Sequence, residues 1–530
     1  KQLIPNDFED IVSMNALYRP GALGMNMVDS YINRKHGKEE VTYGHESVKK
    51  ILGTTYGVIV YQEQVMQIAQ ELSGFSLGQA DILRRAMGKK KKEEMESLRS
   101  TFVDGAVKKD VNERYAANLF DQIEQFAGYG FNRSHSVGYA LIAYQTAWLK
   151  AHYPAEFMAS VLSCDLGNTD NIQLFVDDCK NIGLTVLSPD INQSSYKFEN
   201  PDNKTILYGL GAIKGIGESL VDKIISERAE EKFKDMYDFC LRVGFRRINR
   251  RILTTLIGSG AMDALGKRQD LFARIDSCLK NAEQASERDK SNIRDLFGEE
   301  IITPEISEID DEVEFDEVSA EWSALGFYLD SHPLENKKKE VRNMCGFFIS
   351  ELQSETHNQR ISGCLIQFNV RSGRRGRFAF ATLDDGSGKI EVSIWADAFE
   401  KYRNLLKKGQ VLVVEGMVEK DAYSDSQRHK MIAERILTFD QARREFVKNI
   451  KIDIEDSANT KDIVGSLKEI ANSDDGNLVL ISYKGNTAKA DIVLPKNFSV
   501  NLDDSSIKAL DKRFGAENVE FVYHSQIHIN

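Results

Sequence analysis

The sequence predicts a multidomain α+β protein that is mostly helical through its first half and β-rich in part of its second half. Apolar residues recur at helical spacing up to residue 298, whereas residues 359–438 alternate apolar and polar side chains as strands do. Strand and helix patterns then mix in residues 441–530. A length of 530 residues is sufficient for roughly three to five domains.

The acidity of the chain is concentrated in one segment. Eleven acidic residues and no lysine or arginine lie between Glu299 and Glu321, so the rest of the chain has 69 basic and 70 acidic residues. Residues 299–345 are therefore expected to form a solvated acidic linker or arm, with imitation of DNA as the alternative. The remaining surface can gather basic patches, which is what binding to nucleic acid requires.

Cysteine usage and hydropathy indicate the compartment. The six cysteines stand singly, without a CxxC pair, which argues against a zinc site and against a disulfide framework. No apolar run approaches the roughly 18 residues that a membrane helix needs, and the first residues have no signal-peptide pattern. We therefore expect a cytoplasmic protein without a membrane partner.

Residues 126–158 contain the most informative pattern. A glycine-containing turn leads into a long apolar and aromatic helix that starts with Asn132, Arg133, Ser134 and His135. Backbone amides at a helix start are free donors with partial positive charge, so this turn predicts an anion site, such as a phosphate with a base nearby. The alternative is an ordinary core helix, residues 141–149, with a polar cap.

Residues 76–92 form a second, basic segment. Ser76 and Gln79 have the spacing of a capping box, so a helix is expected to begin there and to end near Gly88. Arg84 and Arg85 project from it, and Asp81 can pair with Arg85 one turn away. Arginine forks fit phosphate oxygens, and the following lysine run, with Lys89 and Lys90, adds diffuse positive charge. A solvated basic face is the alternative.

These two segments, together with LYRPG at residues 17–21 and YQEQ at 61–64, closely resemble the fingers domain of the alpha-subunit family of bacterial DNA polymerase III. The resemblance continues through LGFYL at residues 325–329, HPL at 332–334 and the later β-rich module, in the family's order. It implies the C-terminal portion of such a subunit, without its PHP and palm domains. Residues 1–160 would then be the C-terminal part of the fingers.

The resemblance implies a role in DNA replication for the fingers residues. In such polymerases the fingers bind the incoming deoxynucleoside triphosphate and the templating base of a primer-template DNA. By this likeness the nucleotide-binding residues are Arg19, Arg84, Arg85, Asn132, Arg133, Ser134 and His135.

Catalysis is expected to depend on residues outside this chain. Phosphoryl transfer needs carboxylates that hold two metal ions, and the family carries these aspartates in a palm domain that precedes the fingers. Mg²⁺ is therefore expected in the palm of the complete enzyme, a nucleotidyltransferase, and no cofactor, metal site or catalytic residue is expected here. Asp190 is the only carboxylate in residues 188–192, where a metal site needs two or three. Asp453 and Glu455 are expected on one solvated strand face, so neither group predicts a metal site. We expect the chain alone to be catalytically inactive.

Residues 161–298 contain the pattern of a helix-hairpin-helix. Glycines at 211, 215 and 217 let the hairpin backbone approach a phosphate, and Lys214 adds charge before an amphipathic helix. A degenerate second copy at residues 256–261 follows five arginines at 242, 246, 247, 250 and 251. Such hairpins hold duplex DNA without reading its sequence, and an ordinary helix connector is the alternative. The expected DNA contacts are Lys89, Lys90, Gly211, Lys214, Gly215, Gly217, Arg246, Arg247, Arg250 and Arg251.

Asp295, Leu296 and Phe297 end in the Leu-Phe pair of a peptide that binds a sliding clamp. Ile293 stands where such peptides carry a glutamine, which departs from the usual pattern. The apolar pair lies in a polar neighbourhood beside the acidic arm and is expected to be exposed, so a partner explains it better than a core does. The alternative is an anchor that holds the arm to its own domain.

Residues 346–440 have the plan of an OB-fold, with five strands and a helix, expected over residues 399–408, between the third and fourth strands. Arginines lie beside aromatic residues, a mixture that suits single-stranded DNA. Strand alternation places about half of the aromatics inward, so several rings are expected in the core. We expect weak binding of single-stranded template DNA, carried by Arg374, Arg375, Arg377 and Phe378.

Residues 441–530 are predicted to form a small α/β unit without catalytic spacing. Only the resemblance gives it a role, which is to bind the tau subunit of the clamp loader. Besides a part of a replicative polymerase, two other functions fit these motifs. One is a non-catalytic DNA-binding adaptor, and the other is a lesion-bypass paralogue of the alpha subunit.

Overall fold

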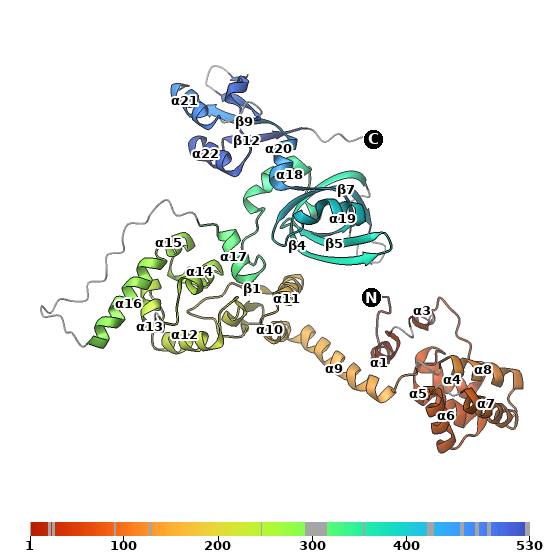
Figure 1. Cartoon of the computed structure of the whole chain (residues 1–530). Helices are drawn as coiled ribbons and strands as arrows, with labels where there is room; N and C mark the ends of the chain where they lie inside the picture. Colours follow the sequence, from red (N-terminus) through yellow and green to blue (C-terminus); the bar gives the residue numbers. More distant parts are fainter. Residues whose placement is uncertain are drawn as a thin grey trace. The chain divides into compact units, whose positions relative to one another are not determined.

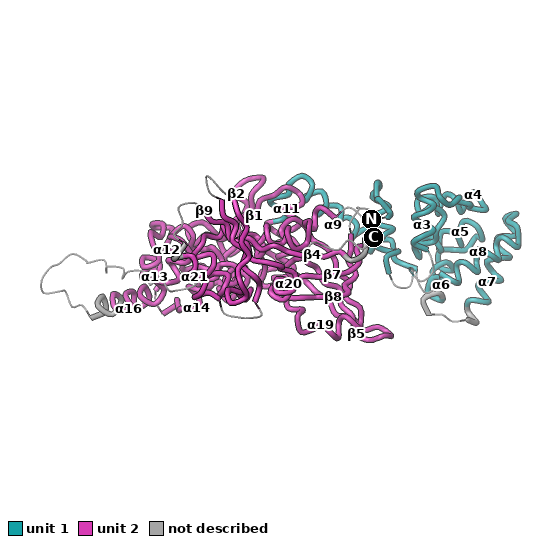
Figure 2. Tube along the Cα trace, turned by 90° about the horizontal axis from the view of Figure 1, so that it is seen from above, with its two compact units in different colours: residues 1–158 teal, residues 159–530 magenta. Residues whose placement is uncertain are grey.

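The computed structural model describes residues 2–19, 23, 27–89, 92–126, 130–244, 246–291, 315–352, 356–420, 429–455, 460–471, 476–484 and 489–524 (Figure 1). The chain divides into two compact units, residues 1–158 and 159–530 (Figure 2). Among the described residues, no helix combines the length and the apolar character needed to cross a bilayer. Nor do three or more metal-ligating side chains of the described residues group as a metal site would require.

The first unit is built mainly of helices in its described part. Its helices are α1 (Phe8–Leu17), α3 (Met27–Lys35), α4 (Glu46–Leu52), α5 (Gln62–Ser73), α6 (Leu77–Lys89), α7 (Lys92–Val107), α8 (Glu113–Phe126) and α9 (Arg133–His152). One core lies among α4 to α8 around the fully buried Ile68, Phe102 and Phe120. A second core joins α1, α3 and the strand-like segment before α5, with Tyr31 and Tyr61 at its centre.

The second unit begins with helices around a small sheet. The first elements are α10 (Pro154–Cys164), which crosses the unit boundary, α11 (Thr169–Asn181), β1 (Thr185–Leu187), β2 (Glu199–Asp202) and β3 (Thr205–Leu207). Strand β3 lies between the other two, parallel to β1 and antiparallel to β2. The helices that follow are α12 (Glu218–Glu230), α13 (Met236–Val243), α14 (Arg250–Gly258), α15 (Arg268–Ala273) and α16 (Ile275–Ser291).

The segment expected to be an acidic arm is structured in its described part, from residue 315 onward. It contains α17 (Glu317–Leu325) and α18 (Lys338–Cys345), and the acidic Glu321 is only 1% exposed. The Glu321 carboxylate accepts hydrogen bonds from the amides of Leu329 and Asp330, at 2.7 and 2.9 Å, and from the amide of Ser331 at 3.1 Å. A buried carboxylate needs such donors, so part of the acidity has a structural role.

A closed five-stranded barrel confirms the predicted OB-fold. Its strands are β4 (Thr356–Gly373), β5 (Gly376–Asp384), β6 (Lys389–Ile394), β7 (Val411–Lys420) and β8 (His429–Thr438), in the order β4-β5-β6-β8-β7. Helix α19 (Ala396–Tyr402) lies between the third and fourth strands, as predicted, although it begins and ends earlier than expected and continues as a short 3₁₀ turn. Ala379, Ala381 and Leu383 point into the barrel core.

The last module is a four-stranded sheet with helices. Its elements are α20 (Phe439–Phe446), β9 (Val447–Glu455), α21 (Thr460–Ile470), β10 (Leu478–Lys484), β11 (Lys489–Val493), α22 (Asp504–Phe514) and β12 (Val519–Tyr523). The strand order is β11-β10-β9-β12, and only the β9–β10 pair is parallel. These elements form the small α/β unit that the sequence predicts.

Candidate nucleic-acid interface

The turn before α9 is fastened to the start of α5. Phe131 forms an isolated β-bridge with Tyr61, and the Gln62 amide donates to the Phe131 carbonyl at 2.9 Å. The Gln62 side chain donates to the Gly130 carbonyl at 3.0 Å. The two sequence segments that seemed separate, 61–64 and 130–135, are therefore one structural unit.

The start of α9 is capped by the protein itself. Asn132 is the N-cap residue, and its side chain accepts a hydrogen bond from the His135 amide at 2.9 Å. Glu63 accepts from the Arg133 amide at 3.0 and 3.2 Å and from the Asn132 side chain at 3.0 Å. The amides of Arg133 and His135 are thus already used, which corrects the expectation of a helix start with free donors.

Cations and rings surround this capped turn. The Arg133 guanidinium donates to Glu9 at 2.7 Å and lies 6.0 Å from the Tyr61 ring centre. Arg19 lies over the Phe131 ring at 4.3 Å. The His135 ring is 5.5 Å from the Phe131 ring and 4.8 Å from the exposed ring of Tyr139. The site combines two arginines with stacked rings, and the Glu9 carboxylate pairs with the Arg133 guanidinium.

Burial changes the acidity of groups below the turn. It raises the pKa of Tyr61 to about 12, so this hydroxyl stays protonated and hydrogen-bonds with Ser13 at 3.1 Å. Burial alone would raise the pKa of Asp10, but hydrogen bonds from Lys35 and from the Asn6 amide lower it. The Lys35–Asp10 pair is almost fully buried, with side chains 5% and 2% exposed. It holds the start of α1 to α3.

The arginines of α6 both pair with a carboxylate of their own helix. Asp81 binds Arg85 at 2.7 Å, as the sequence predicts, and also binds Arg84 at 2.8 Å. The Arg85 side chain is nevertheless 67% exposed. Within the part of the chain that the structure describes, neither arginine is hydrogen-bonded or ion-paired to the turn at residues 132–135. The side chains of Lys89 and Lys90 lie outside the described residues.

Helix α9 presents its apolar residues to the surface, contrary to the alternative of a core helix. Leu141, Ile142, Tyr144, Trp148 and Leu149 are between 42% and 57% exposed. The buried residues of α9 are Ser136 and Ala140, near its start. The apolar pattern of residues 141–149 therefore does not mark a core within the described unit.

The first hairpin has the predicted backbone. Gly215 adopts a φ of +79°, which favours glycine, and Gly217 is the N-cap of α12. Gly211 has a different role, since a Cβ atom there would lie 2.5 Å from the Tyr196 ring. Lys214 is exposed, but its ammonium packs against Gly326 after α17. Burial lowers the pKa of Lys214, and the charge of Asp170 offsets only part of this effect.

The arginine-rich turn before α14 is exposed, whereas the expected second hairpin is not. Arg246, Arg247, Arg250 and Arg251 are all exposed. Residues 256–261 are buried, and a Cβ atom at Gly258 would lie 2.8 Å from the Ala320 carbonyl of α17. This backbone packs closely against α17, so in this structure it is not open to a phosphate as the predicted second copy would require. Asp295, Leu296 and Phe297 lie outside the described residues.

The aromatic residues of β5 face outward. Strand alternation buries Ala379 and Ala381, so Phe378, which was predicted to contact DNA, and Phe380 lie on the other face. The Phe378 ring lies 5.5 Å from Trp395 and 5.6 Å from Phe380. Trp395 is 48% exposed, so the three rings form an accessible aromatic surface. Beside it, the exposed arginines of the β4–β5 hairpin are Arg374, Arg375 and Arg377.

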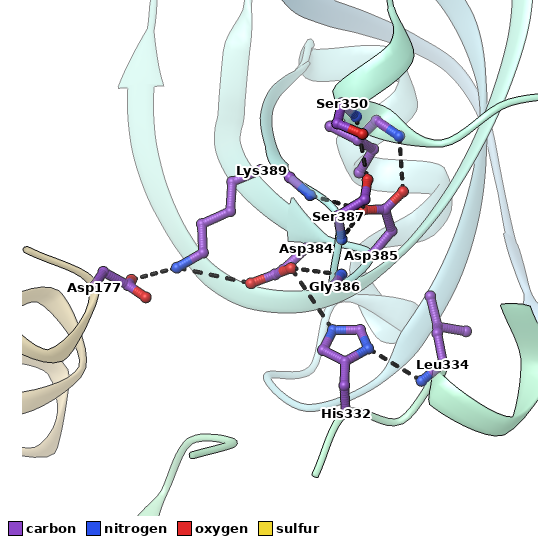
Figure 3. A network of polar contacts seen from close by, with 11 residues as sticks. Asp177, His332, Leu334, Ser350, Asp384, Asp385, Gly386, Ser387 and Lys389 are labelled. Atoms are coloured by element: carbon purple, nitrogen blue, oxygen red, sulfur yellow. Dashed lines mark hydrogen bonds and ion pairs between the residues drawn. The ribbon is translucent and has the colours of Figure 1, made fainter. Parts of the chain in front are cut away.

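A polar network fixes the β5–β6 turn (Figure 3). The buried Asp385 accepts hydrogen bonds from the amides of Ile349 at 2.7 Å, Ser387 at 2.8 Å and Gly388 at 3.0 Å. His332 lies 3.7 Å from Asp384. The turn is thus held to the segment that leads into the barrel, and Lys389 at its end reaches Asp177 of α11.

Known family models match this chain in the same order as its structural modules. A model of the bacterial DNA polymerase III alpha subunit finger domain matches residues 1–110. Models of a helix-hairpin-helix motif and of an OB-fold nucleic acid binding domain match residues 183–271 and 361–438. DNA polymerase III subunit alpha of Vibrio cholerae is 40% identical over 541 residues, which is 99% of this chain and 46% of that protein. Over almost its whole length the chain is therefore similar to bacterial DNA polymerase III alpha subunits.

Other members of the DNA polymerase III alpha family match to a similar extent. The Escherichia coli K12 protein is 39% identical over 99% of this chain and 46% of its own length. The Pseudomonas aeruginosa protein is 38% identical over 99% of this chain and 47% of its own length. The chain therefore spans about half the length of these relatives. A solved RecG–DNA junction complex covers 42% of this chain at 14% identity, and its TM-score of 0.14 supports no argument.

Sequence reasoning missed the acidic partners of the basic residues. Glu63 lies within a motif used for the family resemblance, yet its role as a second cap of α9 depends on a contact between residues 70 positions apart. Glu9, Asp170 and Asp177 were missed for the same reason. Side chains so far apart in sequence give no periodic signal, so only their spatial contacts identify them.

Proposed function

We propose that this chain is the DNA-binding, nucleotide-positioning and partner-binding part of a replicative DNA polymerase III alpha subunit. The observation that carries the proposal is the match over 99% of the chain to alpha subunits, with fingers, hairpin and OB-fold in one order. The substrate is a primer-template DNA together with deoxynucleoside triphosphates. The complete protein acts as a nucleotidyltransferase in template-directed DNA synthesis.

The fingers part positions the nucleotide. Arg84 and Arg85 contact triphosphate oxygens, a role supported by the exposure of Arg85 and by the guanidinium fork. Arg19 and the residues from Asn132 to His135 line the nucleotide pocket, where Phe131 and Tyr139 offer ring faces. Because Glu63 already caps α9, the charge of a triphosphate there is met by the arginine side chains rather than by a row of free amides.

The hairpin region binds duplex DNA, and the barrel binds single-stranded DNA. Gly211, Lys214, Gly215, Gly217 and the four exposed arginines from 246 to 251 contact the duplex backbone, with Lys89 and Lys90 adding charge. The aromatic surface around Phe378 and the arginines of the β4–β5 hairpin bind the single-stranded template.

Two further contacts join the replication assembly. Asp295, Leu296 and Phe297 bind the sliding clamp, and residues 441–530 bind the tau subunit of the clamp loader. Removal of Leu296 and Phe297 should reduce processivity with a clamp and change nothing without one; an equal decrease in both assays would indicate a folding defect. Co-purification of the complete protein with tau, abolished by removal of residues 441–530, tests the second contact.

We propose that this chain alone does not catalyse synthesis. The carboxylates that bind Mg²⁺ belong to the palm in the family, and the residues of this chain bind and orient the substrates. Two assays test the proposal: binding of a labelled primer-template by the chain, and primer extension with Mg²⁺ and all four nucleotides. Tight duplex binding without extension is expected. Extension by the chain alone would disprove catalytic silence, and absence of DNA binding would disprove the wider function.

A further inference from the structure

Two lysines connect the barrel to helix α11. Lys389, at the start of β6, pairs with Asp177, as Figure 3 shows, and Lys408 pairs with Asp170 at 2.7 Å. Both lysines belong to the barrel, and both carboxylates belong to α11. Their positive charge, which nucleic-acid phosphate could use, is therefore already neutralised by the protein's own anions.

The two carboxylates lie on one face of α11. Asp170 and Asp177 are seven residues apart, which places them about two turns and roughly 10 Å apart on the same side of a helix. The opposite face is buried through Ile172, Val176 and Cys179. One acidic helix face thus opposes two lysines of the barrel.

The ionic part of this contact is weak and solvent-accessible. The side chains of Lys389 and Asp177 are 34% and 32% exposed, and those of Lys408 and Asp170 are 35% and 67% exposed. Ion pairs of this exposure are screened by salt and break readily. Neutral contacts hold the barrel to α17 and the residues after it rather than to α11: Trp322 packs on Gly409, and the Tyr328 hydroxyl donates to the Gly409 carbonyl at 3.3 Å. A polyanion can compete only for the ionic part.

We propose that the acidic face of α11 is an intramolecular competitor of nucleic-acid phosphate, which occupies Lys389 and Lys408 until single-stranded DNA displaces it. The inference rests on the proposed binding of single strands by the barrel. DNA binding then separates the barrel from α11 at these pairs, and the two lysines join the basic surface formed by the β4–β5 hairpin.

The test uses the whole chain and a fluorescein-labelled oligothymidylate, with binding measured by anisotropy over a range of salt concentrations. Asp170→Asn with Asp177→Asn removes the competitor and should tighten binding by about three- to tenfold. The same variant should steepen the log–log salt dependence by about 0.7 to 1.4, because each lysine freed for phosphate contributes about 0.7, while Lys389 keeps its pair with Asp384 at 3.7 Å. A purely structural role for the pairs would not change this slope.

A matched control separates competition from net charge. Asp222→Asn with Glu230→Gln removes two exposed carboxylates from α12, so it changes the net charge equally. Its affinity and salt slope should stay close to those of the unaltered chain. The inference is overturned if the α11 variant binds no tighter than this control. If neither the unaltered chain nor the variant binds the oligonucleotide, single-strand binding by the barrel fails as well.

A second measurement follows the barrel directly. Dyes attached at Lys180→Cys on α11 and Lys401→Cys on α19, in a Cys164→Ser background, report their separation by energy transfer; these positions are exposed, and Cys164 is the exposed native cysteine. Oligothymidylate should lower the transfer efficiency in the unaltered chain, and high salt should act in the same direction. Unchanged transfer at saturating oligonucleotide would overturn the inference even if the affinities agree with it.

Discussion

The carboxylate of Glu63 lies 3.0 Å from the backbone nitrogen of Arg133 and accepts its hydrogen bond. This contact joins the start of α5 to the start of α9, and Asn132 completes the cap from its own helix. A negative charge at a helix start is favourable because of the helix dipole. The turn proposed to line the nucleotide pocket is therefore held rigid by a carboxylate rather than left open for an anion.

Glu63→Ala should loosen the first turn of α9. Removal of a charged cap costs about 1–2 kcal/mol, so amides of residues 130–136 should exchange with solvent roughly five- to thirtyfold faster. Hydrogen exchange measured by mass spectrometry checks this. Glu113→Ala is the matched control, since Glu113 is an exposed acidic residue in the first turn of α8. Equal acceleration at both helix starts would show that Glu63 has no special role.

Arg84 and Arg85 can be tested in the complete polymerase. Replacing both with alanine should raise the KM for nucleotide or lower kcat by about tenfold or more, because the variant cannot form charge-assisted hydrogen bonds with phosphate. Steady-state kinetics with varied nucleotide concentration measure the effect. Arg114→Ala, at an exposed arginine of α8, should leave both constants near their original values. Unchanged kinetics in the double variant would remove the assignment.

Local patterns predicted the elements of this fold well, because each depends on neighbours in sequence. Period-2 alternation identified the barrel strands, and the capping box at Ser76 and Gln79 is present, with hydrogen bonds of 2.9 and 3.3 Å. The directions in which the site's side chains point were less predictable. Phe378 could have faced in or out, and only the small residues Ala379 and Ala381, which the barrel core selects, decide its direction.

Buried polar residues show a second limit of sequence reasoning. Glu321 stands in an acidic run that predicts a solvated arm, yet three backbone amides surround its carboxylate. The glycines at 258 and 260 suggested a phosphate-binding hairpin, yet Gly258 allows α14 to pack closely against α17. Composition cannot separate these cases, because the same residue types serve exposed and buried turns.

The exposed arginines before α14 should contribute charge rather than sequence preference. Arg246→Gln with Arg247→Gln should weaken duplex binding equally for unrelated sequences and reduce the salt slope by about 0.9 for each phosphate that the variant no longer neutralises. Anisotropy titrations with two unrelated duplexes measure both quantities. Lys180→Gln, at an exposed lysine of α11, is the control. A weakening that depends on sequence would contradict a backbone-binding role.

Glu340 connects α18 to the last module. It binds the buried Arg443 at 2.6 and 3.0 Å and accepts from the Tyr523 hydroxyl at 2.7 Å. Glu340→Gln removes the nearer carboxylate from a buried guanidinium that also lies 3.4 Å from Asp440, and it should lower the free energy of unfolding by about 3 kcal/mol in urea denaturation. Glu340→Leu with Arg443→Met removes both charges and should cost less. A double variant that is less stable than Glu340→Gln would contradict this account.

His332 should make stability depend on pH below neutrality. Its burial lowers its pKa, although Asp384, Asp385 and Glu335 act in the opposite direction. The unfolded chain then binds a proton more readily than the folded chain, so this contribution is fully present above the ordinary histidine pKa of about 6.5 and decreases as pH falls through it. His332→Asn keeps an acceptor for the Leu334 amide, which donates to the His332 ring at 3.2 Å, and removes the titration. The free energy of unfolding of the two proteins is measured in urea at pH 7.5 and 5.0. The unaltered chain should lose more stability than His332→Asn when the pH is lowered. An equal loss in both proteins would show that His332 does not sense pH.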